Sequence, residues 1–226
     1  MSENPNSTEP RTLPVDAVLF DMDGTLSDTE ALWQEAEKQI VVEYGTRPPG
    51  EWTAQQIGAS LDASAAYLQE HYGVRLDAAE IQRLTIDHVL ALLEEGFEWR
   101  PGARELLAEA KAMGIPSALV TTSPRSVAEA VARPLPAGSF DVIVAAEDVA
   151  QTKPDPAPYL VAARQLGARP EYCLAFEDSV NGTLSAQRAG CLVVVVPTHV
   201  EVEEAERRLI LESLAGVSLS DLVQYL

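Results

Sequence analysis

Acidic residues suited to nucleophilic and proton-transfer chemistry follow an apolar run near the start of the chain. The run VDAVLF, residues 15–20, leads directly into DMDGT, which contains Asp21 and Asp23. Two carboxylates this close repel each other unless a cation lies between them, and Gly24 permits a sharp turn after the run. Because Asp and Gly are also common in ordinary turns, the motif alone leaves both interpretations open.

Two further polar groups follow later apolar runs in the same way. The run PSALV is followed by Thr121, Thr122 and Ser123. Their hydroxyl and N–H groups at a helix start suit a phosphate group, although they equally fit an ordinary helix cap. The run CLAF is followed by Glu177 and Asp178, and Asp178 could simply cap the next helix.

Lys153 follows another apolar run, in the sequence QTKPDP. Most surface lysines are only solvated, but the prolines after Lys153 stiffen this loop, so that its ammonium group can be aimed. If all these groups shared one pocket, they would supply what phosphoryl transfer needs: a nucleophile, oxygen ligands for a divalent ion, an anion clamp and a proton carrier.

The elements that must position these groups form an α/β pattern. Five apolar runs are typical of buried strands: residues 15–20, 116–123, 141–147, 173–179 and 191–197. Three helical patterns, each followed by a glycine, precede the second, fourth and fifth runs: residues 103–113, 156–166 and 180–189. This alternation predicts a parallel sheet, in which ligands bind at the carboxyl ends of the strands. Every polar group above lies at such an end.

The segment between the first run and Pro101 breaks the alternation, with helical periodicity and no clear strand. One expected helix face carries Leu32, Ala36, Ile40 and Tyr44. A second helix, after a capping-box pattern at Asp77 and Glu80, carries Ile81, Leu84, His88 and Leu92 on one side. We therefore expect an all-helical cap over residues 29–99, a core formed by 14–28 and 100–226, and a disordered tail over 1–13.

Composition limits the partners and the setting. The 226 residues are 46% hydrophobic and 23% charged, as in an ordinary soluble globular protein. The formal net charge of −19 argues against nucleic acid as a partner, and a phosphate site would need a metal ion and a lysine to become locally positive. No apolar run is long enough for a membrane span, and the polar start is unlike a signal peptide. We expect a cytoplasmic protein, monomeric by default, with Cys173 and Cys191 buried and reduced.

The four motifs and their order resemble those of phosphatases in the haloacid dehalogenase superfamily. DMDGT, the run ending in Thr121, Lys153 before Pro154, and the pair Glu177-Asp178 carry the resemblance, which covers nearly all of the chain from Val15. The helical insertion resembles the C1-type cap of the phosphoglycolate phosphatase and β-phosphoglucomutase branch. The resemblance implies a Rossmann-like, three-layer core whose parallel sheet has strand order 5-4-1-2-3.

The resemblance also implies a Mg²⁺-dependent phosphatase reaction through an aspartyl-phosphate. Asp21 is then the nucleophile and Asp23 the general acid and base. The expected Mg²⁺ ligands are Asp21, the backbone carbonyl of Asp23, Asp178 and Glu177. The residues expected to bind the substrate, a small phosphorylated metabolite, are Thr121, Thr122, Lys153, Ser123, Gly58 and Ser60, of which Thr121 and Lys153 also stabilise the reacting phosphoryl group.

Several alternatives are weighed against this hypothesis. A dehalogenase lacks the second aspartate, which is present here as Asp23. In β-phosphoglucomutases a cap segment resembling K-G-x-S-R binds a second phosphate, whereas this chain has Ile57-Gly58-Ala59-Ser60-Leu61 and lacks both basic residues, which favours net hydrolysis of a monophosphate. A phospho-aspartate signalling module and a catalytically silent binding protein are further alternatives. Sugar phosphates, phosphoglycolate and glycerol phosphate all remain open as substrates.

Overall fold

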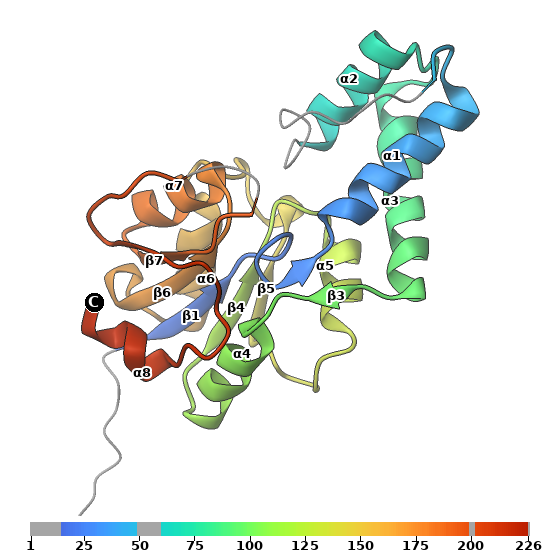
Figure 1. Cartoon of the computed structure of the whole chain (residues 1–226). Helices are drawn as coiled ribbons and strands as arrows, with labels where there is room; N and C mark the ends of the chain where they lie inside the picture. Colours follow the sequence, from blue (N-terminus) through green and yellow to red (C-terminus); the bar gives the residue numbers. More distant parts are fainter. Residues whose placement is uncertain (1–14, 49–59, 199–201, 226) are drawn as a thin grey trace, which may run out of the picture.

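A computed structural model describes residues 15–48, 60–198 and 202–225. The core is a six-stranded, all-parallel sheet of order β5-β4-β1-β6-β7-β8 (Figure 1). Its strands are β1 (Ala17–Phe20), β4 (Ser117–Val120), β5 (Val142–Val144), β6 (Cys173–Glu177), β7 (Leu192–Val195) and β8 (Arg208–Ile210). Read from the β7 side, the first five give the expected order 5-4-1-2-3, and β8 adds a sixth strand at the edge.

Strand β8 was not expected, because the charged sequence after Glu201 favours a helix. Within the described residues this segment instead pairs in parallel with β7, with Leu209 opposite Val194. Backbone hydrogen bonds to the β7 edge outweigh local propensity at this position. The short helix α8 (Leu219–Leu222) follows and contacts α4.

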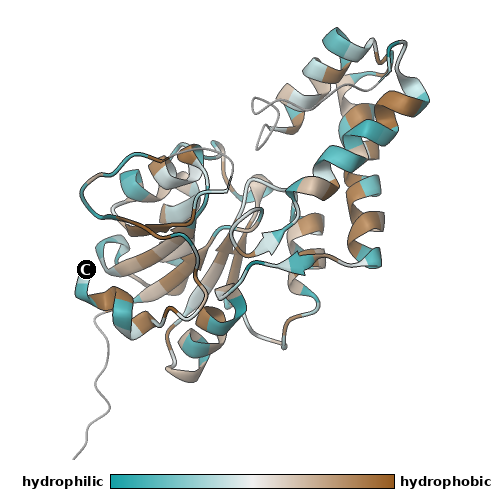
Figure 2. Ribbon diagram, viewed as in Figure 1, coloured by the Kyte–Doolittle hydropathy of each residue, from teal (hydrophilic) through white to brown (hydrophobic). Residues whose placement is uncertain are grey.

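Helices cover both faces of the sheet and make a three-layer core. One face of the sheet packs against α4 (Ala103–Ala112) and α5 (Arg125–Ala132), and the other against α6 (Ala157–Leu166) and α7 (Val180–Ala189). In β1, Val18 and Phe20 face the first layer, whereas Ala17 and Leu19 face the second. Figure 2 shows the resulting apolar sheet between the two layers. Strands that are buried on both faces read as continuous apolar runs, which is why they could be predicted.

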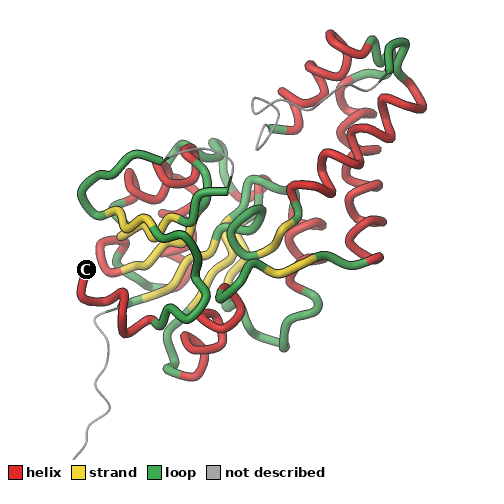
Figure 3. Tube along the Cα trace, in the orientation of Figure 1, coloured by secondary structure: helices red, strands yellow, loops and turns green. Residues whose placement is uncertain are grey.

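The cap contains α1 (Glu30–Tyr44), α2 (Leu61–Tyr72) and α3 (Ala78–Glu95), which extend away from the sheet (Figure 3). They share a small apolar cluster of their own. The predicted buried side of α3 was partly wrong: the buried residues are Ile81, Thr85, Val89 and Leu93. Because α3 packs against both α1 and α5, its apolar stripe is wider than a single row and its centre is not fixed by sequence.

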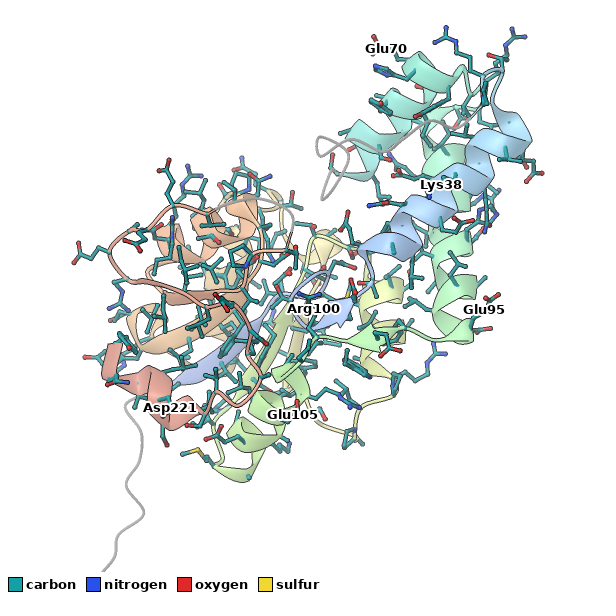
Figure 4. The ribbon with its side chains drawn as sticks, in the orientation of Figure 1. Lys38, Glu70, Glu95, Arg100, Glu105 and Asp221 are labelled. Carbon is teal, nitrogen blue, oxygen red and sulfur yellow. The ribbon has the colours of Figure 1, made fainter. Side chains whose placement is uncertain are left out.

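Two short strands join the cap to the core and correct the expectation of a purely helical segment. β2 (Ser27–Asp28) pairs antiparallel with β3 (Glu98–Trp99). Arg100, labelled in Figure 4, follows β3. Its N–H donates to the carbonyl of Leu26, and its guanidinium lies 3.9 Å from Asp28. Because this pair brings the two ends of segment 29–99 together, we propose that it marks the boundary between cap and core.

The remaining elements are three single 3₁₀ turns: η1 (Ala146–Asp148), η2 (Pro170–Tyr172) and η3 (Val223–Tyr225). Cys173 and Cys191 are both buried free thiols, as expected. Among the described residues, every helix is too short or too polar to cross a membrane. The predicted tail at 1–13 and the cap residue Gly58 lie outside the described residues.

Candidate active site

Asp21 lies directly after β1, at the carboxyl end of the sheet. Its N–H donates to the carbonyl of Phe176 at 3.0 Å, which holds the residue in line with the neighbouring strand β6. The residue is only 8% exposed. Its Oδ1 accepts a hydrogen bond from Nζ of Lys153 at 2.6 Å. Strand β1 therefore places a nearly buried carboxylate against Lys153, which lies in a loop 132 positions further along the chain.

Lys153 joins the ends of three strands through its ammonium group. Besides Asp21, Nζ donates to Oε1 of Glu177 at 2.7 Å and to the carbonyl of Val120 at 2.9 Å. Burial lowers the pKa of Lys153, but the adjacent charges of Asp21 and Glu177 outweigh it, so the pKa is raised overall. The lysine therefore carries a positive charge at neutral pH.

Three buried carboxylates gather beside this lysine. Asp21, Glu177 and Asp178 each offer an oxygen atom, and these atoms lie within 4.8 Å of one another. Burial, followed by the charge of Asp21, raises the pKa of Glu177 to about 8 and that of Asp178 to about 7. The pKa values of Glu177 and Asp178 stay raised even with the ammonium group of Lys153 nearby, so a further cation would stabilise the charged carboxylates. Hard carboxylate oxygens are the ligands that Mg²⁺ prefers, and the residues present therefore fit this ion.

Asp178 is fixed by threonines and by the turn after β1. Its Oδ2 accepts a hydrogen bond from Thr198 at 2.5 Å, and its Oδ1 lies 3.5 Å from the Thr25 hydroxyl. Gly24 has φ +85°, and a Cβ at this position would lie 2.2 Å from Oδ2 of Asp178. The turn thus needs glycine both for its backbone conformation and for the close approach of the carboxylate.

Asp23 has a separate set of three donors. Its Oδ1 accepts hydrogen bonds from the Thr29 hydroxyl at 2.5 Å and from Nε1 of Trp33 at 3.1 Å, and its Oδ2 accepts one from Ser123 at 2.8 Å. Burial raises the pKa of Asp23 despite these hydrogen bonds. Since Trp33 is part of α1 and Ser123 follows β4, cap and core both hold the same carboxylate.

The other predicted site residues divide into two groups. Thr121 is buried after β4: its N–H donates to Val144, and its hydroxyl accepts from the N–H of Ser123 at 3.0 Å, while Thr122 beside it is exposed. Ser60 instead caps α2, accepting from the N–H of Ala63 at 3.2 Å. The hydroxyl of Ser60 caps this helix, and its contact with a substrate stays a prediction.

Comparison with known proteins places this geometry in a family. A sequence model described as haloacid dehalogenase-like hydrolase matches residues 15–190, which include both acidic pairs, Thr121 and Lys153. The chain belongs to the haloacid dehalogenase-like hydrolase family. The family that the motifs implied is confirmed, and so is the parallel α/β core with its helical cap.

Similar proteins in this family are named as phosphatases or solved with phosphorylated ligands. Protein CbbY of Cereibacter sphaeroides is 36% identical over 91% of this chain and 98% of that protein. Hexitol phosphatase B of Escherichia coli strain K12 is 32% identical over 92% of this chain and 93% of that protein. CbbY from Rhodobacter sphaeroides, solved with phosphate, superposes with a TM-score of 0.81 at 34% identity, covering 92% of this chain and 99% of that one; a mutant of it was solved with xylulose-1,5-bisphosphate. The predicted enzyme class, a phosphoric monoester hydrolase, is confirmed at this level.

Four further residues donate to the site carboxylates and belong to none of the sequence motifs. Trp33 belongs to none of the motifs, yet its indole N–H donates to Asp23. Thr29 and Thr198 donate to site carboxylates, and the hydroxyl of Tyr159 donates to Glu177 at 2.5 Å. The position of Thr29 before a predicted helix suggests a helix cap, but the partner of a hydroxyl or indole group depends on tertiary structure and leaves no spacing pattern.

Proposed function

We propose that the protein hydrolyses a small phosphate monoester, with a sugar or sugar-alcohol phosphate as substrate, through an aspartyl-phosphate on Asp21 and with Mg²⁺ as cofactor. The observation that carries the proposal is the contact of Asp21 with Lys153 at 2.6 Å, beside a second aspartate that accepts three separate hydrogen bonds. The name of hexitol phosphatase B and the sugar bisphosphate bound to mutant CbbY support a phosphorylated sugar or polyol.

In the first step Asp21 attacks phosphorus, and the bond from phosphorus to the leaving oxygen breaks. Covalent catalysis of this kind divides one difficult displacement into two easier ones. Lys153 is hydrogen-bonded to the nucleophile Asp21. Its positive charge therefore lies close to the phosphoryl oxygens, where negative charge redistributes during the reaction. Thr121, buried at the end of β4, and the Thr122 N–H are proposed as further donors to these oxygens.

Asp23 supplies a proton to the leaving alkoxide and takes one from the water that hydrolyses the aspartyl-phosphate. Its burial raises its pKa, which favours the protonated form that the first step needs. Thr29, Trp33 and Ser123 fix the orientation of its carboxyl group. Proton transfer requires such geometry before any matching of pKa values.

Mg²⁺ is proposed to bind Asp21, Asp178, Glu177 and the backbone carbonyl of Asp23. The ion would neutralise part of the negative charge that otherwise separates an anionic ester from a carboxylate nucleophile. Glu177 also accepts hydrogen bonds from Lys153 and Tyr159, so its negative charge would be shared between the ion and the lysine.

The mutase alternative requires a cationic group in the cap for a second phosphate. Among the described cap residues, Arg47 donates to the backbone carbonyls of Glu70 and His71, and Lys38 pairs with Glu35. These contacts pair both positive charges with groups of the cap itself, and the segment Ile57-Gly58-Ala59-Ser60-Leu61 contains no basic residue. Hydrolysis of a monophosphate is therefore the function that we propose, and phosphosugar mutase activity is the outcome that a product assay would distinguish.

The proposal is tested by measuring phosphate release from a panel of sugar, sugar-alcohol and small-acid monophosphates with Mg²⁺. We expect turnover that EDTA abolishes and that Asp21→Asn lowers by at least about a thousandfold, because the variant lacks the attacking group. Asp87→Asn, which changes an exposed carboxylate on α3, serves as the matched control. Activity that survives in Asp21→Asn, or an isomerised phosphosugar as the main product, would contradict the proposal.

A further inference from the structure

Tyr159 is buried beneath the candidate site and contacts its ion pair. It is part of α6, and its exposure is 0%. Its hydroxyl donates to Oε1 of Glu177 at 2.5 Å. Nζ of Lys153 lies 5.2 Å from the centroid of its ring, within the range of a cation–π contact. None of the sequence motifs gives this tyrosine a role, although it contacts two residues that the motifs contain.

Glu177 is fixed from two directions. Its Oε1 accepts from both Tyr159 and Lys153, while Oε2 lies 3.4 Å from the Ser179 hydroxyl. A Cβ on Gly182 would lie 1.9 Å from Oε2, so the start of α7 packs closely against the carboxylate. The carboxylate therefore has little room to follow any movement of the lysine.

Lys153 has no spare donor in this arrangement. Its ammonium group carries three N–H donors, and the structure pairs it with three acceptors: Asp21, Glu177 and the carbonyl of Val120. To donate to a phosphoryl oxygen, Lys153 must give up or share one of these contacts. A buried carboxylate that loses a donor is costly, but Glu177 would keep the hydroxyl of Tyr159 on the same oxygen atom, Oε1, besides the longer contact of Oε2 with Ser179.

We propose that Tyr159 is a positioning residue: its hydroxyl holds Glu177, so that Lys153 can turn from Glu177 to the phosphoryl oxygens. This inference rests on the proposed function, in which Lys153 binds the phosphoryl group. Without the hydroxyl, Glu177 would retain Lys153 more strongly, and phosphoryl binding would weaken.

The test is Tyr159→Phe, which keeps the buried ring and removes only the hydroxyl. We expect the inhibition constant of inorganic phosphate to rise, and kcat to fall, each by roughly tenfold, the effect of one hydrogen bond to a charged group. The melting temperature is measured in parallel, and kinetics are recorded well below it. Tyr172→Phe is the matched control, because Tyr172 is 37% exposed and its ring lies against Arg169.

A purely structural tyrosine would give a different result. In that case Tyr159→Phe would lower the melting temperature and leave kcat and the phosphate constant within about twofold of wild type, which would overturn the inference. If the wild-type protein hydrolysed none of the esters, the proposed function would fail separately. Calorimetric titration of wild type and Tyr159→Phe with phosphate in Mg²⁺ would then still test the role of Tyr159, and equal affinities, or no binding by wild type, would overturn it.

Discussion

Asp23 shows at the scale of a single residue how the cap could influence chemistry in the core. Thr29 and Trp33, which donate to its Oδ1, lie at the start of α1, whereas Ser123, which donates to its Oδ2, follows β4. A carboxyl group with three donors is restricted to one orientation, and proton transfer depends on that orientation. The indole of Trp33 is the donor that lies furthest along the cap helix.

We predict that Trp33→Phe lowers kcat about three- to tenfold and changes KM less. The substitution keeps an aromatic ring against the core but removes the N–H that donates to Asp23, and a typical hydrogen bond is worth about 0.5–1.5 kcal/mol. Steady-state kinetics on the best ester of the panel provides the measurement. Trp99→Phe, in β3, is the control with the same chemical change. An equal loss in both variants would assign the effect to packing of the cap.

At the scale of the element, the turn after β1 must both reverse the chain and leave room for Asp178. Gly24 and Gly114 both have positive φ, +85° and +69°, but only the position of Gly24 is crowded: a Cβ on Gly114 would meet nothing within 4 Å. Alanine substitutions at these two glycines therefore separate two losses of stability: that of an alanine in a left-handed backbone conformation, and that of displacing a site carboxylate.

Gly24→Ala should therefore lower stability and Mg²⁺-dependent activity more than Gly114→Ala. We expect Gly114→Ala to cost about 1–2 kcal/mol of unfolding free energy for its left-handed backbone and to leave kcat unchanged. Gly24→Ala should cost more and should raise the Mg²⁺ concentration needed for half-maximal activity, because Asp178 must move. Chemical denaturation and Mg²⁺ titration measure the two effects. If both variants lost the same stability and kept the same Mg²⁺ dependence, the close contact with Asp178 would be unimportant.

The elements that could be predicted from sequence are those with a uniform or periodic pattern of apolar residues, because all of the side chains, or those on one face, are buried. β1, β6 and β7 are buried on both sides, so VLF, LAF and VVV runs identify them, and the glycines after α6 and α7 mark their ends. β8 and the pair β2–β3 could not be predicted, because these two- and three-residue strands exist only through backbone pairing with distant segments. The same limit applies to the site: the carboxylates and Lys153 follow strand ends, whereas Trp33 and Tyr159 lie within helices and have no such marker.

At the scale of the whole molecule, the site concentrates negative charge in a chain that is already acidic. The net charge is −19, and the cluster of Asp21, Glu177 and Asp178 adds local repulsion within 4.8 Å. Any divalent cation would therefore stabilise the fold somewhat by reducing general repulsion. A specific site must produce an additional effect that depends on one of these carboxylates.

We predict that saturating Mg²⁺ raises the melting temperature of the wild-type protein by about 5–10 °C. An ion at about 100 times its dissociation constant contributes about 2.7 kcal/mol, and each kcal/mol corresponds to about 2–4 °C for a protein of this size. Asp178→Asn should lose most of this shift, because a neutral amide replaces a proposed ligand, while retaining the smaller general effect of the divalent charge. Thermal unfolding with MgCl₂, compared with NaCl at equal ionic strength, separates the two contributions. Equal shifts in wild type and Asp178→Asn would mean that Mg²⁺ acts on the acidic surface and that the three carboxylates are not its site.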